Sequence, residues 1–174
     1  KRHYLVPTYT KSKKESIALQ VFTEIFGNPS TGMLFEEFVK NKKIATSAAA
    51  YYYPDGFGDT NLTISIVPKK GVTLNKIETE LNVYLNEIKK KIISKEELKS
   101  TKKRFVNETI FAQDSLYMGM RIFGSSLSTG YSLKDITNWP SDIEKVSLDD
   151  IQNILSKTFN MNKSVTGLLL PIDK

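Results

Sequence analysis

Residues 44–68 read IATSAAAYYYPDGFGDTNLTISIVP, and this segment decides the fold. It contains two stretches that favour β-strands, IATSAAAYYYP and TNLTISIVP, joined by the turn sequence PDGFGD. In the second stretch apolar side chains alternate with mostly small or polar ones, which is typical of a strand that buries one face. The apolar positions are Leu62, Ile64 and Ile66. Two such strands around an Asp-Gly turn predict an antiparallel hairpin.

Helical patterns precede the hairpin. Residues 14–27, KESIALQVFTEIFG, place apolar side chains at helical spacing, and the GNP at 27–29 predicts the end of that helix. A second helix is expected from a cap at Ser30 or Thr31 to the NKK at 41–43. Its inward positions are Met33, Leu34, Phe38 and Val39. Before both helices, RHYLVPTYT at 2–10 is a strand candidate.

Further helices follow the hairpin. Residues 74–92 carry a regular apolar stripe, and SKEE at 94–97 predicts a capping box that opens a longer helix reaching about Gly124. The inward positions of this longer helix are Leu98, Phe105, Thr109, Ala112 and Leu116. Residues 127–140 are expected to form a linker with at most a short helix. SDIEKV at 141–146 and SLDDIQNILSKTF at 147–159 each begin with a Ser-x-x-acid cap, and SVTGLLLP at 164–171 is expected to be a buried closing strand.

This order of elements indicates an α+β fold. We expect one domain over residues 1–174, with an antiparallel or mixed sheet of about four to five strands. The helices are expected to pack mainly on one face of that sheet, because the alternation in the hairpin leaves only one apolar face to cover.

Composition excludes several classes of protein. The chain has 174 residues, of which 40% are hydrophobic, and no cysteine, so it holds neither a disulfide nor a thiolate metal site. Its net charge of +6 comes from lysines scattered beside acidic residues, which favours solvated helix faces over a nucleic-acid interface. No apolar run approaches the roughly 20 residues of a membrane span. Because residue 1 is lysine, we expect a fragment of a longer protein.

The residues offer no self-contained catalytic or metal site. The single histidine is His3, so neither a pair of histidine ligands nor an H-x-x-E-H motif exists in this sequence. Acidic pairs such as Glu36 and Glu37 are adjacent in sequence, and neighbours on a helix do not share a face. The run Tyr51, Tyr52 and Tyr53 either lines a ligand surface or supplies half-buried strand residues.

The order of short motifs resembles the insulinase/pitrilysin family of zinc metallopeptidases, inverzincins that include mitochondrial processing peptidase. GMLF at 32–35 occupies the place of the family's S-R-L-Y, and KIA at 43–45 occupies the place of its x-L-A. PKKG at 68–71 corresponds to the family's P-x-x-G. SKEEL at 94–98 resembles T-x-x-E-L, and residues 139–151 resemble the W-P-x-x-I-x-x-V-T-x-x-D-V of bacterial members. TGLLLP at 166–171 is similar to their final strand, so the resemblance covers essentially the whole chain.

The resemblance implies a role without catalysis in this chain. In the family, a first half binds zinc through H-x-x-E-H and a distal Glu, and a second half of similar fold closes a chamber around the peptide substrate. This chain would be that C-terminal half of a bacterial member, with no catalytic or metal-binding residue of its own and with zinc in the N-terminal catalytic domain of the same protein. By analogy its compartment would be the periplasm or the cell envelope.

One departure from the family pattern concerns substrate contacts. Many second halves carry an Arg and a Tyr seven residues apart that contact the substrate, and Val39 and Thr46 stand at those positions here. Either a homologous partner subunit supplies the Arg/Tyr pair, or the protein is a noncatalytic structural subunit of the same fold. The substrate-facing candidates are Val39, Thr46, Tyr51, Tyr52 and Tyr53.

Overall fold

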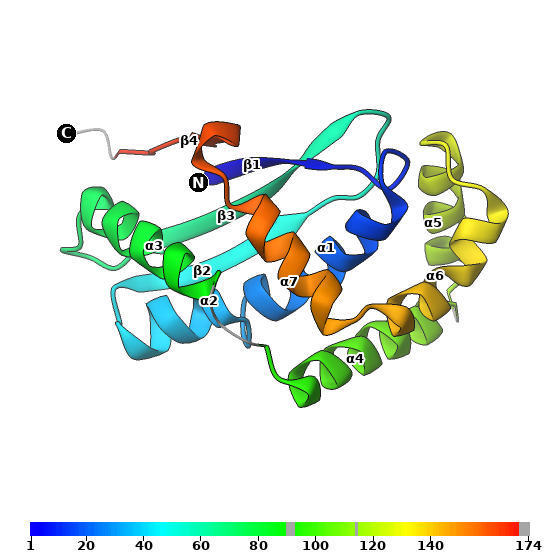
Figure 1. Cartoon of the computed structure of the whole chain (residues 1–174), viewed down its shortest axis with the longest axis horizontal. Coiled ribbons are helices and arrows are strands. Elements are labelled where there is room, and N and C mark those ends of the chain that lie inside the picture. The colour runs from blue at the N-terminus through cyan, green and yellow to red at the C-terminus, as the bar shows by residue number, and fades with distance from the viewer. Residues whose placement is uncertain (90–92, 114, 171–174) are drawn as a thin grey trace.

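The computed structural model describes residues 1–89, 93–113 and 115–170, without the side chains of residues 108–113. Within these residues four strands form one sheet in the order β2-β3-β1-β4 (Figure 1). The strands are β1 (Arg2–Pro7), β2 (Ala45–Tyr52), β3 (Asp59–Pro68) and β4 (Ser164–Thr166). Every pairing is antiparallel, and β2 and β3 form the expected hairpin. The α+β prediction is confirmed.

Helices cover one face of this sheet, where α1, α3 and α7 lie across the strands in Figure 1. The helices are α1 (Lys13–Gly27), α2 (Met33–Phe35), α3 (Leu74–Ile88), α4 (Lys95–Gln113), α5 (Leu116–Ser128), α6 (Leu133–Lys145) and α7 (Leu148–Thr158). A π-helical turn, Glu36–Asn41, continues α2, and a 3-10 turn, Met161–Lys163, precedes β4.

An aromatic cluster joins the sheet to α1 and to the end of α7. The ring of Phe159 lies 5.3 Å from that of Tyr4, 5.9 Å from Phe22 and 5.4 Å from Phe26, measured between centroids. All four side chains are buried. These rings, together with the buried aliphatic side chains of the core, hold the helical layer on the strands.

The beginning of the second helix differs from expectation. Neither Ser30 nor Thr31 caps it; their backbone N–H groups instead donate to Asn28 Oδ1 at 3.0 and 3.1 Å, in the turn that precedes the helix. Helix α2 then starts after Gly32, which offers no side-chain cap.

The expected long helix after residue 94 is two helices. Ser94 caps α4 by accepting a hydrogen bond from the N–H of Glu97 at 3.0 Å, which is one of the two bonds of the predicted capping box. Ser115 then caps α5 by accepting a hydrogen bond from the N–H of Met118. Because a new helix begins there, the residues of α5 do not continue the inward face of α4. Leu116 is therefore 89% exposed and not inward. The side chains of Thr109 and Ala112, and Ile92 at the end of the apolar stripe, lie outside the described residues.

Residues 127–140 do not form the expected linker. Ser132 and Asp135 make a reciprocal capping box, so α6 starts there and continues to Lys145 with Pro140 inside it. The cap expected at Ser141 is wrong because that residue lies within the helix. The cap at Ser147 is confirmed as a capping box with Asp150.

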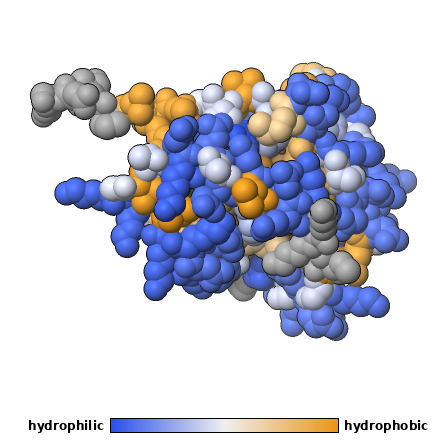
Figure 2. Space-filling view, turned by 60° about the vertical axis from the view of Figure 1, so that its left-hand side comes forward, coloured by the Kyte–Doolittle hydropathy of each residue, from blue (hydrophilic) through white to orange (hydrophobic). Residues whose placement is uncertain are grey.

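The closing strand is shorter and more exposed than expected. Only Ser164–Thr166 pair with β1, and Gly167 then bonds to Lys1. Leu168, Leu169 and Leu170 are 54%, 91% and 70% exposed, and Pro171 lies outside the described residues. In Figure 2 hydrophobic surface accordingly lies next to the C-terminal end at the upper left, whereas most of the surface in view is hydrophilic.

Candidate functional site

A groove of about 340 Å³ runs beside the outer edge of β2, between that strand and the end of α1. It is lined by Gln20, Thr23, Glu24, Gly27, Asn28, Pro29, Ala50, Tyr51, Tyr52, Tyr53, Pro54 and Phe105. Two elements define the position of the groove, because α1 ends at Gly27 and the chain changes direction at Asn28 and Pro29. The groove therefore lies just beyond the end of α1, next to the edge strand β2.

The edge of β2 presents backbone groups to this groove. The backbone nitrogen of Lys1 donates to the carbonyl oxygen of Gly167, and the N–H of Gly167 donates to the carbonyl oxygen of Lys1, both at 2.8 Å. Because backbone groups of successive strand residues face opposite sides, those of Arg2 face Ile64 of β3. Alternation along β3 and β2 then directs the N–H and C=O groups of Ala50 and Tyr52 outward. In the described part of the chain no strand pairs with that side of β2. Unpaired strand edges are where extended peptides add to sheets in peptide-binding domains, although here Gly27 packs against the backbone of Ala50.

The three tyrosines take different positions. Tyr51 and Tyr53 are 43% and 71% exposed on the sheet face opposite the helices. Tyr52 points to the helical side, where its hydroxyl hydrogen-bonds to the carbonyl oxygen of Pro7 at 2.7 Å and to the hydroxyl of Ser16 at 2.8 Å. Burial raises the pKa of Tyr52, so its hydroxyl stays protonated and structural. Tyr52 therefore borders the groove, and the two exposed rings are the ones a ligand can reach.

Two buried polar atoms line the groove without a hydrogen-bond partner in the described structure, Gln20 Nε2 and Thr23 Oγ1. The amide orientation of Gln20 is fixed by Trp139, whose Nε1 donates to Gln20 Oε1 at 2.9 Å. Buried polar groups are nearly always paired in proteins, so these two atoms are exceptions that need a partner such as an ordered water. Both atoms are shielded from solvent, so neither is open to a peptide in the groove with the side chains in these positions.

Charge contributes little to this site. Glu24 accepts a hydrogen bond from Asn28 Nδ2 at 2.7 Å and lies 3.6 Å from the Arg104 guanidinium. The one carboxylate of the groove lining is thereby satisfied within the protein. Apart from Glu24, the residues that line the groove are uncharged.

Val39 and Thr46 lie away from the groove, near the opposite end of β2. Val39 is half-buried in the π-helical turn and packs against the core. Thr46 is exposed at a bulge between Ala45 and Ser47, and its hydroxyl donates to the carbonyl oxygen of Val67 at 3.3 Å. The structure therefore groups the three tyrosines and leaves these two candidates apart. Sequence reasoning missed Gln20 and Thr23, because helical spacing marks them only as positions on α1.

The described residues contain no group of three or more His, Cys, Asp or Glu side chains that could hold a metal ion. His3 lies on the sheet face opposite the helices, where its Nδ1 is 2.9 Å from the hydroxyl of Thr63. No helix in the described residues is long and apolar enough to cross a membrane.

A family model described as the peptidase M16 inactive domain matches residues 3–105, more than half of the chain. No curated protein matches the chain.

Solved structures share the fold. The inactive peptidase domain of a candidate zinc protease from Bordetella parapertussis gives a TM-score of 0.85 at 14% identity, covering 99% of this chain and 91% of that one. A protease from Helicobacter pylori gives 0.84 at 18% identity, covering 94% of this chain and 38% of that one. The periplasmic protease PqqL from Escherichia coli gives 0.70 at 13% identity, with 91% and 17% covered. The chain thus spans less than half the length of the Helicobacter pylori protease and of PqqL.

Proposed function

The chain belongs to the family of M16 peptidase inactive domains, and from this we propose that it is the closing half of a zinc-dependent endopeptidase chamber. In this proposal it is one domain over residues 1–174 that encloses and aligns a peptide substrate. Zinc and the hydrolytic step belong to an N-terminal catalytic domain of the same protein. The chain's own contribution is to hold the substrate in a productive orientation.

The groove beside β2 is the single observation that carries this proposal. It combines outward backbone groups at Ala50 and Tyr52 with exposed rings at Tyr51 and Tyr53. These features fit an extended polypeptide of varied sequence, because main-chain hydrogen bonds do not depend on side-chain identity. A protein that aligns many peptides needs this tolerance.

The second candidate is a noncatalytic structural subunit of the same fold. The observation that favours it is the loss of the expected substrate contacts, since Val39 is packed against the core and Thr46 offers only a short hydroxyl. The closing-half proposal accounts for the same loss if a homologous partner subunit supplies the Arg/Tyr pair. We further propose a location in the periplasm or cell envelope of a bacterium, in line with the structurally similar PqqL, which is described as a periplasmic protease.

Binding of an unstructured peptide tests the proposal. Fluorescein-labelled, carboxymethylated insulin B chain is titrated with the 174-residue chain, and fluorescence anisotropy gives the dissociation constant. We expect saturable binding that weakens at least threefold in the double variant Y51A/Y53A, since each lost aromatic contact costs on the order of 0.5–1 kcal/mol. The matched control is Tyr117→Ala on α5, whose ring is 68% exposed and does not line the groove.

The outcomes separate the two candidates. Absence of binding, or an equal loss in Y117A, would contradict a peptide-aligning role and leave the structural subunit. Hydrolysis of the peptide by the chain alone after addition of Zn²⁺ would contradict both candidates. Sequencing the reading frame upstream of Lys1 then decides whether an H-x-x-E-H domain accompanies this chain.

A further inference from the structure

Four lysines gather on one side of α4, on a surface that we call the α4 lysine face. The surface is formed by Lys95, Lys99, Lys102 and Lys103. Each lies three or four positions from another of the four, and residues at that spacing are neighbours on a helix. Together with Leu98 and Val106 they line a hollow of about 540 Å³. In Figure 1, α4 lies along the lower edge of the molecule, away from both chain ends.

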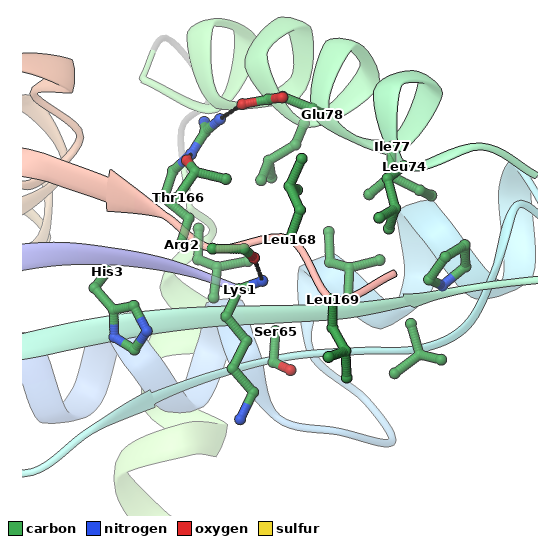
Figure 3. A pocket seen from close by; sticks show the side chains of 16 residues that line it. Lys1, Arg2, His3, Ser65, Leu74, Ile77, Glu78, Thr166, Leu168 and Leu169 are labelled. Carbon is green, nitrogen blue, oxygen red and sulfur yellow. Dashed lines mark hydrogen bonds and ion pairs between the residues drawn. The ribbon is translucent and has the colours of Figure 1, made fainter. Parts of the chain in front are cut away.

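The α4 lysine face has no ion pair in the part of the chain that the structure describes. Of the basic residues on α4, only Arg104 pairs with a described acid, at 3.6 Å from Glu24. By contrast, both lysines of α1 pair with carboxylates of α6 or α7. The buried Arg2 likewise pairs with Glu78 at 2.9 Å (Figure 3). The α4 lysine face therefore carries positive charge that ion pairs within the described protein do not neutralise.

The hollow beside this face is electropositive. Among the described residues that line it, Glu144 is the one acid. Its backbone carbonyl oxygen accepts a hydrogen bond from Lys102 Nζ at 2.9 Å, so Lys102 is held toward the end of α6. The other three lysines, Lys95, Lys99 and Lys103, are exposed. Four ammonium groups against one carboxylate leave a net charge of +3 around the hollow, which attracts an anionic ligand.

Part of the lining is apolar. Leu98 is buried and Val106 is half-buried, and both lie on the hollow between the lysines in sequence. The lysine side chains are themselves aliphatic up to the ammonium group. An exposed ion pair contributes little affinity by itself, so a ligand of this surface needs an apolar contact as well as anionic groups.

The spacing of the lysines indicates a ligand with several anionic groups. Lys95 and Lys103 are eight residues apart, which is about 12 Å along a helix. One phosphate or one carboxylate is too small to contact both. A polypeptide with carboxylates at every fourth position of a helix matches, because these repeat every ~6 Å, as the lysines do.

Two other polyanions match this surface less well. Single-stranded nucleic acids stack their bases on aromatic side chains and on arginine, and the described residues that line the hollow include neither. A helix that lies in a lipid surface inserts large apolar side chains. None of the large apolar side chains described on α4 is exposed. The chemistry of the face therefore favours a polypeptide.

We propose that the α4 lysine face binds an acidic polypeptide segment, with carboxylates against Lys95, Lys99 and Lys103 and an apolar side chain against Leu98 and Val106. The hollow shares no described lining residue with the groove beside β2, and the proposal does not depend on the proposed function.

The probe is a fluorescein-labelled decapeptide amide, EAALEAAAEA, which places glutamates one turn apart and a leucine beside them. We expect saturable binding by fluorescence anisotropy at low ionic strength, where exposed charges are screened least. With the ¹⁵N-labelled 174-residue chain, the amide resonances that shift should lie within residues 95–107. Glutamine in place of the three glutamates should weaken binding about tenfold, and glutamine in place of the leucine about threefold.

Protein variants complete the test. K99E/K103E should bind the probe about tenfold more weakly, because it removes two attractions and adds repulsion. K69E/K70E is the matched control, since it makes the same change in net charge at two exposed lysines that do not line the hollow, and it should bind within about twofold of the unmodified chain. Val106→Gln should weaken the leucine peptide about threefold and leave the peptide without leucine unchanged. Circular dichroism checks that each variant is folded.

The groove variant Y51A/Y53A should bind the acidic peptide unchanged, which separates this inference from the proposed function. An equal loss in K99E/K103E and K69E/K70E would show attraction by net charge alone and would overturn the proposal. Absence of saturable binding, or equal binding of the peptide without glutamates, would overturn it too. So would tighter binding of an oligothymidine or of phosphatidylserine vesicles through the same lysines.

Discussion

Gly27 at the end of α1 lies so close to Ala50 of β2 that a Cβ on Gly27 would be 2.5 Å from the Cβ of Ala50 and 2.6 Å from its backbone nitrogen. The contact involves backbone, so neither side can move without displacing α1 or the strand. A glycine and an alanine at this crossing therefore bring the helix end onto the edge strand. This approach sets the position of the groove beside β2.

Gly27→Ala is expected to destabilise the protein by about 1–3 kcal/mol through overpacking. Gly124→Ala is the control, because nothing lies within 4 Å of its Cβ position in α5 and alanine favours the helix by roughly 0.5–1 kcal/mol. Urea denaturation measures both free energies of unfolding. An unchanged stability in G27A would contradict the close contact.

Tyr52→Phe is expected to cost about 1–3 kcal/mol, because it removes two buried hydrogen bonds and leaves Ser16 without that partner. Tyr53→Phe, at an exposed ring, should stay within about 0.5 kcal/mol of the unmodified chain. Thermal unfolding followed by circular dichroism compares them. Equal melting temperatures would show that the Tyr52 hydroxyl has no structural role.

Arg2→Ala is expected to cost about 2–4 kcal/mol, since the buried guanidinium bonds to Glu78, Asn82 and Thr166 and its loss leaves these groups unpaired. Lys11→Ala, which breaks the exposed ion pair with Asp59, should cost less than about 1 kcal/mol. The two free energies of unfolding in urea give the comparison. A cost for R2A no larger than that for K11A would contradict the buried network.

Acid should weaken the capping box of α6. The Ser132 hydroxyl, and then the Lys13 ammonium group, hold the pKa of Asp135 well below its usual range. A depressed folded-state pKa adds stability that is fully present above the unfolded value of about 3.9 and is lost as pH falls through the folded value. Unfolding free energies from pH 5 to 2 should therefore fall less steeply in Asp135→Asn than in the unmodified chain. Parallel curves would contradict this contribution.

Sequence patterns sufficed where one local rule acts without competition. The alternation in 62–66 and the turn at 54–59 predicted the β2–β3 hairpin. The apolar stripe of residues 74–92 predicted α3, which the structure describes as Leu74–Ile88. The cap at Ser147 was likewise correct. Each of these predictions depends on residues that are close to one another in the sequence.

Local rules failed where two signals of the same kind compete. Ser132 and Ser141 both precede an acidic residue by three positions, and the helix begins at the first, where Tyr9 and Lys13 from distant segments also bond to Asp135. The division of the expected long helix into α4 and α5 has the same cause. Ser115 acts as a second cap, although the apolar pattern continues past it.

The sequence by itself determined the α+β class, the hairpin and the absence of a histidine- or cysteine-based metal site, because periodicity and composition are properties of the chain. Only the tertiary structure decided where the groove beside β2 lies. It depends on the approach of Gly27 to Ala50, which are far apart in the sequence. The groove borders a strand edge that has no partner strand in the described residues, and side-chain patterns carry no record of that edge.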